Sequence, residues 1–149
     1  MRAVVQRVSG ASVEIPSNNY SARIGNGLLI LLGIKSGDCI KDVNFVADKC
    51  SRLRIFEDNE YNLNCSVQDV DGEVLVISQF TLYGETAKGN RPSFIEAAKT
   101  DEAIPLYEEF VKRLKQNLGE SKIKTGIFGA MMDVHLVNSG PVTVIVESK

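Results

Sequence analysis

Apolar residues at every second position predict β-strands in the first third of the chain. Residues 11–15 alternate strictly, with Ala, Val and Ile on one side and Ser and Glu on the other, as in a strand with one buried face. Residues 2–8 also predict a strand. Residues 28–34 are continuously apolar, which favours a fully buried strand. The sequence IGNG at 24–27 predicts a hairpin turn before it.

Two later stretches have the 3.6-residue period of amphipathic helices. In the first, the apolar positions are Val43, Val46, Ala47, Cys50 and Leu53. In the second, they are Ile104, Tyr107, Phe110, Val111, Leu114 and Leu118. Thr100 is expected to cap the second helix and Gly119 to end it.

Between the two helices the pattern changes from regular to irregular. DVDG at 69–72 predicts a turn, and EVLVISQFTL at 73–82 predicts a strand. The polar, Gly-containing residues 83–93 indicate a loop of the kind that carries function. SFIEAAK at 93–99 indicates one or two helical turns, and residues 122–147 predict two or three strands. These elements predict one domain over 1–149, an α+β fold with a mixed or antiparallel sheet.

Composition narrows the classes of function. The 149 residues carry a formal net charge of −2, unlike most proteins that grip long nucleic acids, although a local basic patch could contact one RNA end. No secretory signal is expected, and LLILLGI is far shorter than a membrane span. Cys39, Cys50 and Cys65 lack CxxC spacing, which favours reduced, buried thiols in a cytosolic protein.

The chain has one histidine, His135, which limits the available chemistry. In MMDVHLVN it shares a strand face with Asp133, a pattern typical of a solvent-facing stripe. A Ser-His-Asp triad or a zinc site therefore has little support. No P-loop or dinucleotide fingerprint is present.

Three motifs remain as candidate sites, each with an ordinary structural alternative. SQFTLYG at 78–84 places polar groups at a strand end, either as plain alternation or as a site. Lys88 and Arg91 in KGNRPSF are loop residues that solvent would satisfy, or cations that contact RNA phosphates. Phe128 and Met132 in TGIFGAMM suit core packing, or a pocket for a base.

The sequence NSGPVTVIVE near the C-terminus is also ambiguous. Gly140 and Pro141 precede a β-branched run, although proline cannot donate a ladder hydrogen bond. The dipeptide is either ordinary turn punctuation or a rigid element with a cis bond.

Six stretches, in order and spacing, together resemble the D-aminoacyl-tRNA deacylases: MRAVVQRV, GLLILLGI, VISQFTLYG, KGNRPSF, TGIFGAMM and NSGPVTV. The resemblance implies a barrel-like fold with a few packed helices. It implies a cytoplasmic homodimer, with active sites at the subunit interface, that hydrolyses the ester between a D-amino acid and the 3′-terminal adenosine of tRNA. It also implies removal of glycine from mischarged tRNA, with no metal, cofactor or membrane.

The resemblance also assigns roles to residues by their motifs. Ser78, Gln79, Phe80 and Thr81 correspond to the catalytic, ester-binding segment. Phe128 and Met132 correspond to the adenosine pocket, and Arg7 to the residue that supports the Gly-Pro. Gly140 and Pro141 correspond to a Gly-cisPro that enters the partner subunit's pocket, where a rigid backbone would reject L side chains by clash.

Two positions depart from the family pattern. Ser139 stands where Asp is commoner, and His135 where a small polar residue is frequent. Two alternatives stay open: a paralogue with relaxed chirality, against which Arg7 argues, and a non-catalytic RNA-end-binding module on the same fold, against which Ser78–Thr81 argues.

Overall fold

One long strand, β1 (Arg2–Ile15), organises the sheet of this computed structural model, which describes residues 1–149. Its first half pairs antiparallel with β3 (Gly27–Gly33) on one side and with the end of β8 (Asp133–Glu147) on the other. Its second half pairs with β2 (Tyr20–Ile24) and with the start of β8. Register shifts on either side of Val8 mark an irregularity in the β1–β8 ladder. The two strands expected at 2–8 and 11–15 are therefore one strand.

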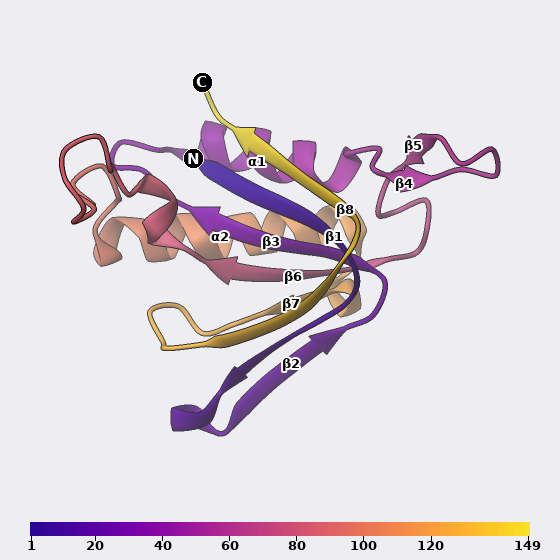
Figure 1. The fold of residues 1–149 in the computed structure, drawn as a ribbon, viewed down its shortest axis with the longest axis horizontal. Helices are drawn as coiled ribbons and strands as arrows, with labels where there is room; N and C mark the ends of the chain where they lie inside the picture. Colours follow the sequence, from indigo (N-terminus) through magenta and orange to yellow (C-terminus); the bar gives the residue numbers. More distant parts are fainter.

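The middle of the sheet is parallel. β3 pairs parallel with β6 (Glu73–Ser78), and β6 pairs parallel with β7 (Ile123–Thr125). Parallel neighbours need crossover connections, and α1 (Ile40–Arg52) and α2 (Thr100–Leu118) supply them on the same face of the sheet (Figure 1). The carboxyl ends of the three strands therefore lie at one end of the sheet, where open sheets most often bind ligands.

The short elements lie between these. They are η1 (Pro16–Asn18), β4 (Phe56–Glu57), β5 (Leu63–Cys65), η2 (Phe80–Tyr83) and η3 (Glu120–Lys122). β4 and β5 form a separate hairpin that projects from the end of the molecule opposite the 84–99 loop (Figure 1). Neither α1 nor α2 has the combination of length and apolar character that would cross a membrane.

Apolar side chains fill both faces of the bent sheet. The larger core packs α1 and α2 against it and includes the fully buried Phe110 and Val46. The smaller core lies where the sheet curls over itself and includes Leu29 and Ile77. Tyr20 on β2 helps to close this curl, because its hydroxyl donates a 2.8 Å hydrogen bond to the carbonyl of Thr125 on β7. The predicted α+β fold with a mixed, barrel-like sheet is confirmed.

Some local predictions are wrong. The helix cap is Lys99, not Thr100, because the carbonyl of Lys99 already accepts hydrogen bonds from the N–H groups of Glu102 and Ala103. SFIEAAK forms no helix; its residue Ala97 makes an isolated bridge to Lys35 instead.

The predicted burial of the cysteines is correct for only one of the three. All three are free, but only Cys50 is buried, while Cys65 is partly exposed and Cys39 exposed.

Candidate active site

A cavity of about 650 Å³ opens at the carboxyl ends of β3 and β6. Its walls come from the η2 turn, the 94–99 segment, the first turn of α2 and the 128–134 segment. Most of the lining is apolar, as is usual for ligand pockets. The uncharged polar side chains in its lining are Ser78, Gln79 and Thr100, and the only titratable one is Lys99.

The η2 turn forms because β6 ends at Ser78, four residues before the end of the strand that the sequence predicts over 73–82. Past Ser78, the backbone N–H of Gln79 donates to Leu32 at 2.8 Å, and the chain then turns across the end of β3. A Cβ at Gly33 would lie 3.0 Å from the Leu82 Cβ and 3.1 Å from the Gln79 carbonyl oxygen. Glycine at 33 therefore allows the turn to cross closely, and residues 80–83 form a 3-10 helix rather than a strand.

Three of the four predicted catalytic residues line the cavity: Ser78, Gln79 and Phe80. Thr81 lies outside the lining but is joined to it, because Gln79 Nε2 donates a hydrogen bond to Thr81 Oγ1. Phe80 presents its ring to solvent at the cavity mouth, with 58% of its surface exposed. The N–H groups of Phe80 and Thr81 start the turn and so have no acceptor within it.

The predicted base-binding residues line the same cavity. Phe128 packs edge-to-face on Tyr107, with ring centroids 5.5 Å apart. Met132 is partly buried and packs against the smaller apolar core, and both side chains reach the cavity from the segment after β7. Residues 78–80 and 128–132, about fifty positions apart, are thus brought together.

Phe94 also lines the cavity, and sequence reasoning missed it. Its ring meets Phe80 edge-to-face, with centroids 5.2 Å apart and planes at 72°. The loop beneath is fixed by two backbone hydrogen bonds between Glu85 and Ser93, of 2.8 and 2.9 Å. Phe94 ends the motif KGNRPSF, so the sequence did offer it as a candidate. That motif was interpreted only through its charged residues, Lys88 and Arg91.

Gly140 and Pro141 do not line this cavity in their own chain. Their peptide bond is cis and both residues are exposed on β8. Arg7 Nε donates a 3.1 Å hydrogen bond to the Ser139 carbonyl, and Arg7 Nη1 donates one of 2.9 Å to Ile55. A Cβ on Gly140, whose φ is +119°, would lie 2.7 Å from Arg7 Nη2.

Lys88 and Arg91 lie on the exposed loop beside the cavity, outside its lining. Neither takes part in an ion pair, whereas Lys35 nearby is paired with Glu96 at 3.2 Å. His135 is exposed on β8, and no three His, Cys, Asp or Glu side chains gather as a metal site.

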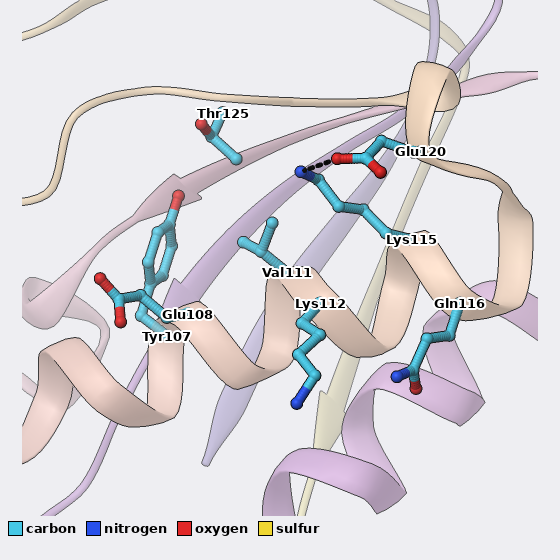
Figure 2. Close-up of a pocket in the computed structure, with 8 residues that line it drawn as sticks. All are labelled: Tyr107, Glu108, Val111, Lys112, Lys115, Gln116, Glu120 and Thr125. Carbon is cyan, nitrogen blue, oxygen red and sulfur yellow. Dashed lines mark hydrogen bonds and ion pairs between the residues drawn. The ribbon is translucent and has the colours of Figure 1, made fainter.

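A second, more open groove lies along α2 (Figure 2). None of the predicted site residues lines it. Lys115 in its wall is held by Glu120 at 3.0 Å, and Lys112 by Glu109 at 3.0 Å. Tyr107 donates a 3.0 Å hydrogen bond to Val76, and burial raises the pKa of its hydroxyl, which therefore stays protonated. The two lysines and the tyrosine of this groove are thus already paired within the chain.

Comparison with known proteins gives the family of the chain. The family profile described as D-Tyr-tRNA(Tyr) deacylase matches residues 4–147. Proteins of Flavobacterium johnsoniae and Flavobacterium psychrophilum, both named D-aminoacyl-tRNA deacylase, are 53% and 54% identical over 149 residues, covering 100% of this chain and 98% of each relative. A solved structure named c-Myc DNA Unwinding Element Binding Protein superposes with a TM-score of 0.93 at 41% identity, covering 100% of this chain and 99% of that one.

Matches that span the whole chain place the protein among the hydrolases of aminoacyl-tRNA. More narrowly, the chain belongs to the D-Tyr-tRNA(Tyr) deacylase family. The resemblance found in the sequence and the enzyme class are confirmed.

Proposed function

We propose that the cavity binds the 3′-terminal adenosine of a D-aminoacyl-tRNA and hydrolyses the ester at the η2 turn. The observation that carries this proposal is the meeting of Ser78–Phe80 with Phe128 and Met132 in one cavity. An aromatic ring and a thioether suit a base, while the polar strand end suits an ester. Glycine, which has no side chain to be rejected, is removed from mischarged tRNA by the same site.

Thr81 positions the substrate in this proposal and does not attack it. A threonine hydroxyl needs a base to take its proton, and Lys99 is the only titratable group in the cavity wall. Thr81 Oγ1 also accepts a hydrogen bond from Gln79, which draws electron density from the oxygen. The ribose 2′-OH beside the ester instead activates water, and the N–H groups of Phe80 and Thr81 stabilise the developing oxyanion.

In this proposal, Gly140 and Pro141 of the partner subunit select between D- and L-aminoacyl groups. These residues are exposed, outside their own cavity, and held from behind by Arg7. Asn138 adds support, since its Oδ1 accepts a 3.3 Å hydrogen bond from the Val142 N–H. A backbone wall fixed in this way excludes an L side chain by clash, whatever that side chain is.

The proposed homodimer forms through β8 and the exposed outer face of the sheet. Val137 and Ile145 on β8 are 63% and 64% exposed, and β8 pairs only with β1, which leaves its other edge open. Exposed apolar groups beside an open strand edge are typical of a surface that pairs with another chain. The same contact would deliver Gly140 to the partner's cavity.

tRNA approaches the loop that carries Lys88 and Arg91, whose charges are free to contact phosphates. Because translation supplies this substrate, we place the enzyme in the cytoplasm, where its three thiols stay reduced.

The deciding experiment is release of D-tyrosine, L-tyrosine and glycine from charged tRNA by the purified protein. The proposal expects fast release of D-tyrosine and glycine and little release of L-tyrosine. Comparable release of D- and L-tyrosine would instead indicate a paralogue with relaxed chirality. Binding of the RNA end without any release would indicate a non-catalytic module.

A further inference from the structure

We propose that Arg2 is a positioning residue for this site, holding the η2 turn through the carbonyl of Leu82. Arg2 Nη1 donates a 2.8 Å hydrogen bond to that oxygen. Arg2 lines no part of the cavity, so it acts on the reaction through the turn and not on the substrate. The inference rests on the deacylase activity proposed above.

Backbone hydrogen bonds hold the start and the middle of the η2 turn, whereas Arg2 holds its carboxyl end. The Gln79 N–H donates to the Leu32 carbonyl at 2.8 Å, the Leu82 N–H to the Gln79 carbonyl at 3.3 Å, and the Gly84 N–H to the Thr81 carbonyl at 3.0 Å. The Leu82 carbonyl lies at the carboxyl end of the turn, where the backbone dipoles favour a cation. Loss of Arg2 would leave this carbonyl without its charged donor and free the turn to shift.

Arg2 is itself held on two sides. Its Nε and Nη2 donate to Glu147 Oε1 on β8 at 3.1 and 2.8 Å. Its guanidinium carbon lies 5.0 Å from the centroid of the Tyr83 ring, within the range of a cation–π contact. A planar guanidinium can make these contacts simultaneously, whereas a lysine ammonium cannot. Arg2 therefore ties the η2 turn to β1, which carries it, and to β8, which carries Glu147.

The position of the turn matters because its first two N–H groups are the proposed oxyanion donors. A donor displaced from the developing charge loses transition-state stabilisation while ground-state binding of the adenosine is unaffected. Phe128 and Met132, which hold the adenosine in this proposal, line the cavity, whereas Arg2 does not. The expected signature is a fall in kcat with KM nearly unchanged.

The test measures hydrolysis of D-tyrosyl-tRNA by Arg2→Met, Arg2→Lys and Glu147→Gln, below the thermal unfolding transition of each variant. Arg2→Met is expected to lower kcat about tenfold or more, with KM within about twofold. Arg2→Lys should recover part of the loss. Glu147→Gln removes the charge but keeps an oxygen that can accept the Arg2 hydrogen bonds, so the bond from Arg2 to Leu82 should persist and kcat should stay near that of the unsubstituted protein.

A second measurement separates this inference from the proposed function. Amide hydrogen exchange at Leu82 and Gly84 should speed up in Arg2→Met and not in Glu147→Gln. If the unsubstituted protein releases no D-tyrosine, the proposed function fails, and exchange still reports on the contact. Normal kcat in Arg2→Met, an equal loss in Glu147→Gln, or unchanged exchange would each overturn the inference.

Discussion

Arg7 on β1 donates a hydrogen bond of 3.1 Å from Nε to the carbonyl oxygen of Ser139, the residue directly before Gly140. Only 8% of Arg7 is exposed, and its Nη2 also lies 3.7 Å from Glu57 on β4. A buried guanidinium with several partners has little freedom to move. The place of the Gly-Pro on the surface is therefore set from inside the sheet.

Replacing Arg7 by Met should weaken discrimination between D- and L-tyrosyl-tRNA. The Ser139 carbonyl loses its charged donor, so Gly140 and Pro141 can shift and admit the L side chain. Each lost hydrogen bond to a charged group should also cost about 1.5–3 kcal/mol of unfolding free energy. The ratio of kcat/KM for the two substrates measures the first effect and chemical denaturation the second. Arg23→Met on β2, where Arg23 is exposed, is the matched control, and an unaltered ratio in Arg7→Met would refute the assignment.

Thr81→Ala should keep substantial turnover, because the hydroxyl positions the ester and does not attack it. A substrate charged at its 3′-OH but ending in 2′-deoxyadenosine should be hydrolysed far more slowly by the unsubstituted enzyme. Single-turnover release of labelled D-tyrosine measures both. A trapped acyl-Thr81 adduct, or normal hydrolysis of the deoxy substrate, would return the nucleophile's role to Thr81.

Replacing Lys88 and Arg91 together by Ala should raise KM and leave kcat nearly unchanged. Phosphate contacts release counterions, so the slope of log KM against log salt should flatten by about 1–2 units for two lost contacts. Lys112→Ala with Lys115→Ala is the control, since it removes two cations already paired on α2. A fall in kcat alone would count against tRNA contact by the loop.

Val137→Asp and Ile145→Asp should each dissociate the proposed homodimer, because they place a charge on an exposed apolar contact. Sedimentation at micromolar concentration is the measurement, with D/L discrimination tested on the same samples. Glu14→Asp, an exposed acidic position on β1, serves as the control. An unsubstituted protein that is monomeric at this concentration and still discriminates by chirality would contradict the shared site.

Stability should fall in acid through the contact between α1 and α2. The Arg113 hydrogen bond to Asp48 lowers the pKa of that carboxyl from 3.8 to about 2. A depressed folded-state pKa stabilises the protein above the unfolded value, and the contribution is lost as the pH falls from about 4 towards 2. Denaturant midpoints across this range should decline less in Asp48→Asn than in the unsubstituted protein. Asp133→Asn, at an exposed carboxylate outside both helices, is the control. Its denaturant midpoint should decline in parallel with that of the unsubstituted protein.

The fold class could be predicted because the spacing of apolar residues within each segment distinguishes a helix from a strand. The stripe from Val43 to Leu53 predicted α1, and alternation at 11–15 predicted half of β1. The break of β6 at Ser78 could not be predicted, because it depends on the close approach of η2 to Gly33, far away in the sequence. The hairpin of β4 and β5 was also missed, since its strands are too short to show a period.

The site could be located by its motifs but not assembled from them. Ser78–Thr81 and Phe128 were recognised separately, and only the parallel pairing of β6 with β7 brings the two segments to one end of the sheet. Arg2 and Phe94 act through neighbours that are distant in the chain, Leu82 or Phe80. Local pattern contains no information about such partners.

The pairing of β1 with β8 has a consequence for synthesis on the ribosome. Arg2 is opposite Glu147 in the ladder. Of the strands in this sheet, β1 is made first and β8 last, so β1 can complete this pairing only after β8 has been made. Until then one edge of β1 has no neighbour, and such edges invite wrong pairing. Gly140 and Pro141 lie on that late strand, so the sheet is completed by the same segment that carries the proposed chiral selector. A nascent chain therefore does not finish its sheet before the selector has been made.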